Sequence, residues 1–391
     1  MDIDSRIRRH RQRGTESDIV LNWNRLNPVA HVEEPIGRGP FVERILDHLD
    51  PAFDGALPAS AYVWGPPGSG KSVVLTALCG RLTASTMHSP AAIETTTRVQ
   101  TVELPRFVYV DARSADSTFQ LYRRLLDELS ETGPPQQGVS TDDVRNRLRE
   151  RLSTGIGTVV TVDHVDEDDH DPLETLANIE SIDAPVSVIF VGQTPPSNVD
   201  DDWDITGIEI PGYSQPVLID VLMTRASAGL AQDVFTYEQA RRIAAWAGGN
   251  AHDALAGLFG AAVRAKEDGA TTLRDEDISA GIEAVTRGGR SLGVVLSLPP
   301  NRQAVLRSFL DLTEADRSSV TAASKAIAQS ESIDLSAGTV KRYLYELAED
   351  GIFDRVTAEQ RAGKGRPPSR LEPRFPTIVF ETVYDFQHPP S

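Results

Sequence analysis

Two hydrophobic rhythms alternate along the first half of the chain. Short runs of β-branched and aromatic residues are typical of buried strands, and between them apolar residues recur at helical spacing. The strand-like runs cover residues 61–64, 107–111, 158–163, 186–191 and 205–210. The helical patterns cover residues 72–84, 117–131, 141–153 and 172–180. Strands separated in this way by helices predict an α/β fold, with a parallel sheet and helices on its faces.

The pattern changes after the last of these strands. Residues 214–286 hold four helical stretches in succession and no strand-like run, which predicts a separate small α-domain. Arg287-Gly288-Gly289-Arg290 is typical of a hinge, and the Pro299-Pro300 pair marks the start of a third unit.

The third unit has the pattern of a winged helix. Helices are expected over residues 302–312, 319–328 and 336–351. Ser336 is a suitable N-cap for the last of them, and Gly351 is a suitable C-cap. Two strands joined by a long loop are expected over residues 352–356 and 377–380.

Basic residues gather at two places in this unit. Lys341, Arg342 and Tyr345 fall on the polar side of its third helix, which suits the major groove of DNA. The loop holds Arg361, Lys364, Arg366, Arg370 and Arg374, opposed by Glu359 and Glu372. A basic wing of this kind suits phosphates. The candidate DNA contacts are Lys341, Arg342, Tyr345, Lys364, Arg366 and Arg370. The alternative is a winged helix that docks on proteins and whose charges are simply solvated.

The overall charge changes this picture in both directions. A net charge of −18 argues at first against a nucleic-acid partner. Residues 290–391 hold 13 basic and 13 acidic residues, however, so the excess of acid lies entirely in residues 1–289. Only five of the 39 basic residues are lysine, and an acidic, lysine-poor surface suits a high-salt cytoplasm. Against that background, the neutral C-terminal part is comparatively basic.

Composition also indicates where the protein works. No stretch approaches the length and apolarity of a membrane span. Residues 1–18 are rich in arginine and poor in apolar residues, so we expect a disordered basic arm there. The single cysteine, Cys79, cannot form an intrachain disulfide. We therefore expect a cytoplasmic protein with no membrane partner.

The octapeptide Gly65-Pro66-Pro67-Gly68-Ser69-Gly70-Lys71-Ser72 matches the phosphate-binding loop G-x-x-x-x-G-K-[ST]. A strand-like run before it and a helical pattern after it would aim backbone N–H groups and a positive helix end at one anion. Lys71 would reach the β- and γ-phosphates of a nucleotide, and the Ser72 hydroxyl would bind Mg²⁺. A chance turn is the alternative, and the flanking elements argue against it. The candidate nucleotide-binding residues here are Gly65, Pro66, Pro67, Gly68, Ser69, Gly70, Lys71, Ser72 and Val73.

Asp163 ends the strand-like run over residues 158–163. A carboxylate in this position is the expected partner of a phosphate-binding loop, where it holds Mg²⁺ through water. An ordinary strand-end Asp is the alternative. The predicted cofactors are ATP or ADP together with Mg²⁺, with Ser72 and Asp163 as the metal-binding residues.

Four further motifs occur in a characteristic order around the loop. They are Glu33-Glu34-Pro35-Ile36-Gly37-Arg38; Ile210-Pro211-Gly212-Tyr213 followed by Leu218, Leu222 and Arg225; Gly248-Gly249-Asn250-Ala251-His252-Asp253-Ala254-Leu255; and Leu298-Pro299-Pro300-Asn301-Arg302. Over nearly the whole chain, this order resembles the archaeal origin-recognition initiators of the Orc/Cdc type, which are AAA+ ATPases with a C-terminal winged helix. In that family the motifs are, in turn, an adenine-side motif, the opening of the lid, the second sensor and the start of the winged helix.

The resemblance implies a divergent, haloarchaeal-like replication initiator. Its domains would be a basic arm (1–18), an AAA+ α/β domain (19–212), a helical lid (213–289) and a winged-helix DNA-binding domain (290–391). It adds to the candidate nucleotide-binding residues Pro35, Ile36, Arg38, Tyr213, Arg225 and His252. The implied partners are origin duplex DNA, the replicative helicase and further copies of the chain on DNA.

The chain departs from the family pattern at the end of two strands. The family follows its strand-end Asp with a Glu that polarises the attacking water, and here that position is His164. Glu167 is a conceivable substitute, but it is displaced past the strand end. Gln193 or Thr194 stands where the family has a polar residue, usually Asn, after the fourth strand. Histidine can act as a base near neutral pH, although its reach differs from that of Glu.

Two more departures concern groups that would touch the γ-phosphate. His252 stands where the family has its second-sensor Arg, and residues 193–224, where relatives carry a trans-acting finger, contain neither Arg nor Lys. Arginine fingers are worth about 10³–10⁵ in rate elsewhere. We therefore expect an AAA+ ATPase by descent that hydrolyses ATP slowly or not at all, with ATP or ADP as a structural ligand or slow switch.

The function that follows is an ATP-binding replication initiator that grips origin DNA through its winged helix and AAA+ module. Two alternatives stay open. One is a nucleotide-locked transcriptional regulator or plasmid maintenance factor on the same scaffold. The other is a signalling NTPase whose winged helix docks on proteins.

Overall fold

The computed structural model describes residues 18–30, 32, 34–87, 103–115, 117–130, 138–167, 170–330, 333–357 and 369–388. The predicted basic arm, apart from Asp18, and the predicted DNA contacts Lys364 and Arg366 lie outside the described residues. Contacts divide the chain into two compact units. One is His31–Tyr213, and the other combines Met1–Ala30 with Ser214–Ser391. Of the helices described, none has the length and apolarity to cross a membrane.

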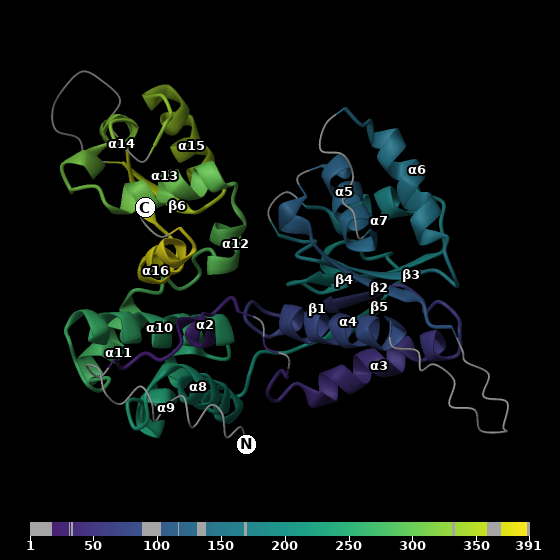
Figure 1. Ribbon diagram of the computed structural model, residues 1–391, viewed down its shortest axis with the longest axis horizontal. Coiled ribbons are helices and arrows are strands. Elements are labelled where there is room, and N and C mark those ends of the chain that lie inside the picture. Colours follow the sequence, from purple (N-terminus) through teal and green to yellow (C-terminus); the bar gives the residue numbers. More distant parts are fainter. Residues whose placement is uncertain are drawn as a thin grey trace. The chain divides into compact units, whose positions relative to one another are not determined.

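A parallel sheet forms the centre of His31–Tyr213, here named the α/β unit (Figure 1). Its strands are β1 (Ala61–Trp64), β2 (Arg106–Asp111), β3 (Thr158–Asp163), β4 (Val186–Gly192) and β5 (Thr206–Glu209). They lie in the order β2-β3-β4-β1-β5, and each neighbouring pair is parallel. The predicted strands are confirmed. Because they all run the same way, the loop after β1 and the residues that end β2, β3 and β4 meet at one edge.

Helices cover both faces of the sheet (Figure 1). One face carries α3 (Gly39–Phe53) and α4 (Lys71–Met87), and the other carries α5 (Thr118–Leu129), α6 (Thr141–Leu152) and α7 (Pro172–Glu180). Successive strand residues point to opposite faces. Tyr62 therefore belongs to the hydrophobic core beneath α5–α7, and its neighbour Val63 belongs to the core beneath α3 and α4.

Polar caps determine where two of these helices begin. The Ser140 hydroxyl accepts a hydrogen bond from the Asp143 N–H (3.1 Å), and the Asp143 carboxylate accepts one from the Ser140 N–H (3.3 Å). This capping box starts α6. Asp171 accepts from the Leu173 N–H (2.9 Å) at the start of α7, where Pro172 suits the first turn. Each cap contributes about 1 kcal/mol.

The second unit contains the predicted small α-domain and, after it, the C-terminal part. The helices of the α-domain are α8 (Gln215–Gly229), α9 (Tyr237–Ala247), α10 (Ala251–Glu267) and α11 (Asp275–Glu283). Gly248 ends α9 in a left-handed conformation (φ 58°), and the Asn250 side chain caps α10 by accepting from the Asp253 N–H at 3.1 Å. The Gly-Gly-Asn motif is therefore the turn between two helices.

The residues that precede the α/β unit pack on this bundle. They include the short helix α2 (Trp23–Leu26). The Leu21 N–H donates to the Gly229 carbonyl (2.8 Å), and a Cβ placed on Gly229 would lie 2.7 Å from the Leu26 side chain. Residues 19–30 were predicted to belong to the α/β domain, but they group with the helical bundle. Hydrophobic periodicity shows that a segment is amphipathic, but it does not show which neighbour covers the apolar side.

The C-terminal part contains helices and a small antiparallel sheet in the pattern of a winged helix. Its elements are α12 (Leu292–Ser297), α13 (Pro300–Leu310), α14 (Val320–Ala328), α15 (Ala337–Glu349), β6 (Phe353–Thr357), β7 (Ser369–Pro373) and α16 (Thr377–Gln387). Ser336 caps α15 as predicted, because its hydroxyl accepts from the Thr339 N–H at 3.2 Å. Gly351 follows the helix in a left-handed conformation (φ 72°).

The second predicted strand of the wing was wrong. Residues 377–380 begin α16, and β7 pairs with β6 in their place. The run Thr377-Ile378-Val379-Phe380 has high strand propensity, but Val379, Phe380 and Val383 are the buried residues of one helical face. Tertiary packing of that face decided the structure. As a result, Arg370 lies within a strand and not in the loop.

Candidate functional site

The phosphate-binding loop joins β1 to α4 in the geometry that its motif predicts. Gly68 and Gly70 adopt φ angles of 68° and 83°, which side chains with a Cβ rarely adopt. A Cβ on Gly65 would collide with the Ile210 carbonyl, and one on Gly70 would lie 2.6 Å from the Tyr213 hydroxyl. Glycine is therefore required at both ends of the loop. Because α4 begins at Lys71, the N–H groups of its first turn have no partner within the helix.

Lys71 lies against the loop that it follows. Its side chain is 8% exposed, and its ammonium donates to the carbonyls of Gly65 (2.7 Å) and Pro66 (3.1 Å). Burial lowers the pKa of Lys71, although the charges of Asp163 and Glu167 act in the opposite direction. The loop thus holds a buried cation beside a helix N-terminus, a combination that attracts an anion.

Arg38 and Tyr213 meet beside the same loop, although 175 positions separate them in the sequence. The Arg38 guanidinium lies 3.5 Å from the centre of the Tyr213 ring and donates to the Pro211 carbonyl at 3.1 Å. Its Nε has no hydrogen-bond partner within the described part of the chain and lies 3.4 Å from the position of a Cβ on Gly70. Two predicted nucleotide-binding residues, Arg38 and Tyr213, therefore lie beside the loop. Pro35 and Ile36, which come shortly before Arg38 in the sequence, are half-buried.

Asp163 ends β3 at the same edge of the sheet and is 1% exposed. Both of its oxygens accept hydrogen bonds from the protein. The Tyr109 hydroxyl donates to Oδ2 (2.6 Å), and the His164 N–H donates to Oδ1 (2.8 Å). Tyr109 was not predicted as a site residue, because its place beside Asp163 depends on β2 pairing with β3.

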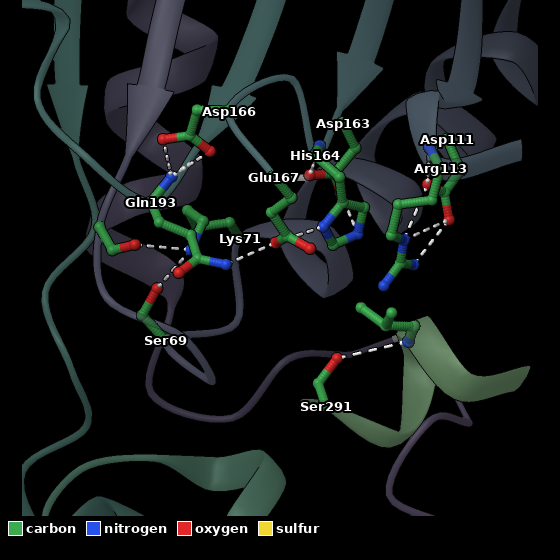
Figure 2. A network of polar contacts seen from close by, with 12 residues as sticks. Ser69, Lys71, Asp111, Arg113, Asp163, His164, Asp166, Glu167, Gln193 and Ser291 are labelled. Carbon is green, nitrogen blue, oxygen red and sulfur yellow. Dashed lines mark hydrogen bonds and ion pairs between the residues drawn. The ribbon is translucent and has the colours of Figure 1, made fainter. Parts of the chain in front are cut away.

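His164 stands in a left-handed conformation (φ 63°), which is uncommon for a residue with a side chain and often marks a functional site. Its ring lies between two carboxylates (Figure 2). Nδ1 lies 2.8 Å from Glu167 Oε1, and Nε2 lies 3.7 Å from Asp163 Oδ2. Burial disfavours the imidazolium, but Asp163 and the hydrogen bond to Glu167 outweigh it and raise the pKa of His164. The two carboxylates therefore favour the protonated ring over the neutral one.

Glu167 is part of the same network. Its Oε1 also accepts from the Gln193 side chain at 2.6 Å. Burial acts to raise the pKa of Glu167, but the bonds from His164 and Gln193 hold that pKa at about 2. Since an ionised carboxylate only accepts hydrogen bonds, the Nδ1–H of His164 is the donor in their contact.

Two further carboxylates at this edge, Asp166 and Asp111, also have donors within the protein. Asp166 accepts from the backbone N–H groups of Gln193 (2.7 Å) and Thr194 (2.9 Å). The Arg113 guanidinium binds Asp111 through Nη2 (2.6 Å) and Nε (3.0 Å). The position of Asp111 at the end of a predicted strand was a usable signal. What the sequence did not show was that this strand lies beside β3.

Arg225 and His252 belong to the other unit, where both have structural contacts. The buried Arg225 guanidinium donates to the backbone carbonyls of Asn27 and Ala30, which fastens the N-terminal segment to α8. His252 Nε2 accepts from the Leu292 N–H (3.0 Å), one of the N–H groups that begin α12. Their predicted contacts with a nucleotide stay predictions.

The exposed side of α15 brings the predicted DNA contacts together. The Lys341 ammonium donates to the Thr321 hydroxyl (3.1 Å), and no carboxylate of the described residues pairs with it. The Arg342 side chain is 65% exposed, and its ion pair with Glu346 is long, at 3.8 Å. Arg355, which was not predicted as a contact, lies 4.9 Å from the centre of the Tyr345 ring and adds a cation from β6. Arg370 is already paired with Glu372 on β7.

Known proteins resemble the chain over most of this arrangement. Residues 34–191 match the family described as AAA ATPase domain. The ORC1-type DNA replication protein 1 of Halobacterium salinarum is 30% identical over 270 residues, which are 65% of this chain and 79% of that protein. The chain belongs to the family of ORC1-type DNA replication proteins. The ORC1-type DNA replication protein 8 of the same organism is 27% identical over 327 residues, 78% of this chain and 79% of the relative.

A solved structure extends the likeness to the whole fold. The structure of the Aeropyrum pernix ORC1 protein in complex with DNA has a TM-score of 0.60 to this ORC1-type chain. At 22% identity, it covers 95% of this chain and 98% of the other. The predicted fold class is confirmed, with an AAA+ α/β domain and further C-terminal domains. The family that the sequence motifs indicated is confirmed as well.

Proposed function

We propose that this ORC1-type protein is a replication initiator that binds ATP or ADP in its α/β unit and duplex origin DNA through its winged helix. One observation carries the proposal: a phosphate-binding loop with a buried lysine and a helix with basic side chains on its exposed side occur in one chain of this family. The first suits a nucleotide, and the second suits the major groove. Recruitment of a replicative helicase and self-association on DNA stay predictions of the family resemblance.

Nucleotide binding would use the loop as follows. The N–H groups of the loop and of the first turn of α4 would donate to the phosphates, and the Lys71 ammonium would turn from the loop carbonyls to the β- and γ-phosphates. Arg38 and Tyr213 would border the pocket on the side of Gly70. His252 and Arg225 would contribute only after leaving the backbone groups that they now hold.

One of the two predicted Mg²⁺ residues, Asp163, already has partners for both of its oxygens without a metal ion. Mg²⁺ is held by oxygen ligands at short distances and would neutralise phosphate charge. Ser72 stands in the first turn of α4, where a hydroxyl suits the ion, but both oxygens of Asp163 already accept hydrogen bonds within the protein. We therefore assign no step of the function to the metal.

Slow or absent hydrolysis is part of the proposal. A general base must be able to accept a proton at working pH. The His164 ring is buried, which acts against its protonation, but Asp163 and Glu167 on either side raise its pKa and so disfavour the neutral form that a base requires. Glu167, with a pKa of about 2, is too weak a base and is held by two donors. A single-turnover assay with Mg²⁺ at high salt tests this. Hydrolysis at about one per second or faster, as in competent enzymes, would contradict it.

The initiator assignment is tested by chromatin immunoprecipitation with sequencing. We expect peaks at replication start zones. Peaks confined to promoters would replace the proposal with a transcriptional regulator. Footprinting with the purified protein at molar salt is the second test, and complete absence of DNA protection would favour a protein-docking winged helix.

A further inference from the structure

Four carboxylates at the ends of β2 and β3 and in the turn after β3 each accept hydrogen bonds from donors of the protein itself. Among the described residues, Asp111 binds the Arg113 guanidinium, Asp163 accepts from Tyr109 and His164, Asp166 accepts from two backbone N–H groups, and Glu167 accepts from His164 and Gln193. A buried carboxylate whose oxygens accept such hydrogen bonds does not need a cation to offset its burial.

His164 supplies a donor to each of two neighbouring carboxylates, Asp163 and Glu167. Its ring nitrogens face Glu167 Oε1 at 2.8 Å and Asp163 Oδ2 at 3.7 Å, and its ring is only 15% exposed. A glutamate in the same place would add a carboxylate to this edge and remove the donor to Glu167. Buried like charges at such short distances are strongly unfavourable unless a cation lies between them.

We propose that this site binds adenine nucleotide without requiring Mg²⁺, because His164 and Tyr109 supply at the strand edge the partners that a metal ion would otherwise supply. The inference rests on the proposed nucleotide binding. It concerns affinity, and it is consistent with a nucleotide that stays bound as a structural ligand. Lys71 and the N–H groups of the loop remain the partners of the phosphates.

The test is the affinity of the full-length protein for a fluorescent ADP analogue at high KCl, measured once with excess Mg²⁺ and once with excess EDTA. We expect the two dissociation constants to agree within about threefold, which is less than the 1.4 kcal/mol of a tenfold change. A loss of tenfold or more in EDTA, with tight binding in Mg²⁺, would overturn the inference and leave the proposed function intact. No saturable binding under either condition would overturn both.

Single substitutions test whether His164 and Tyr109 are the residues that make nucleotide binding independent of Mg²⁺. His164→Glu should make binding depend on Mg²⁺ by about tenfold or more, since two adjacent carboxylates would then need a shared cation. Tyr109→Phe, which removes only one hydroxyl donor from Asp163, should make nucleotide affinity depend on Mg²⁺ by a smaller factor. This variant keeps the test available if His164→Glu does not fold. His170→Gln is the matched control, because the His170 ring bonds to the Ala112 carbonyl and not to a carboxylate. Unchanged Mg²⁺ dependence in both His164→Glu and Tyr109→Phe would contradict the account.

Discussion

The α/β unit and the winged helix both contain clusters of charged side chains, but the charges are buried and paired in the first and exposed in the second. In the α/β unit, Lys71 and Asp163 are 8% and 1% exposed and are bonded to named partners. On α15 the Arg342 side chain is 65% exposed, and Lys341 is bonded to a neutral hydroxyl. Buried, paired charges are weakly screened by salt, whereas exposed charges are strongly screened. A protein rich in acidic residues can thus keep one site that is insensitive to salt and one that responds to it.

The largest expected effect comes from removing the buried cation. Lys71→Ala should abolish measurable nucleotide binding, because the phosphates would lose the only ammonium beside the loop among the described residues. Thermal unfolding with and without ADP measures it. Ligand at about a hundred times its dissociation constant should stabilise the wild type by about 2.7 kcal/mol and the variant not at all. Equal stabilisation of both proteins would show that the nucleotide binds elsewhere.

DNA binding by the winged helix and nucleotide binding by the α/β unit should differ in their dependence on salt concentration. If the winged helix neutralises about four phosphates, a fourfold rise in KCl should weaken DNA binding by about a hundredfold through counterion release. Nucleotide affinity should change far less over the same range. Fluorescence titrations of both ligands on one preparation provide the comparison. Parallel slopes for DNA and nucleotide would contradict the difference between a buried and an exposed site.

Single cations on α15 should each have a moderate effect. Arg342→Ala and Lys341→Ala should each weaken DNA binding by about five- to tenfold, or about 1 kcal/mol. The nucleotide affinity of both variants should equal that of the wild type. Electrophoretic mobility shifts at fixed salt measure the first, and the fluorescent analogue measures the second. Lys266→Ala, in the helical bundle, is a control of matched charge that should leave DNA binding unchanged.

Asp253 tests the effect of burial on a charge in the helical bundle. Burial raises the pKa of Asp253 from 3.8 to about 6, with Arg287 opposing the shift. The folded state therefore holds the proton more tightly than the unfolded state, so the contribution to stability is complete below about pH 4 and is lost as the pH rises through 6. Asp253→Asn should raise the free energy of unfolding at pH 7.5 by about 1 kcal/mol, after allowance for partial exposure. Urea unfolding from pH 4 to 8 measures it, and Asp220→Asn on the surface of α8 should show no comparable gain.

The smallest effect is expected at Arg370. Its charge is already paired with Glu372, so Arg370→Ala should weaken DNA binding by only about twofold. Glu372→Ala, which releases that arginine, should strengthen binding by a similar factor. A loss at Arg370 as large as that at Arg342 would show that the strand pair, and not α15, is the main DNA surface.

Much of the fold could be predicted from local patterns. The five strands of the sheet, the helices between them and the cap at Ser336 were all found from hydrophobic period and capping residues. Residues 377–380 were assigned wrongly, because a short β-branched run has the same appearance in a strand and in a buried helical face. The helices α2 and α12 were missed, since four and six residues give too little periodicity, and the 15-residue helix α3 was not predicted either.

The candidate site divides in the same way. The sequence alone determined the phosphate-binding loop, the strand-end position of Asp163 and the substitution of His164, because each depends on residues that are close together in the chain. Only the tertiary structure decided that Tyr109 donates to Asp163, that Arg38 stacks on Tyr213, and that Arg225 and His252 hold backbone groups of their own unit. The order of strands in a sheet and the packing of one segment on another depend on how much apolar surface the whole molecule buries. A local sequence pattern does not contain that information.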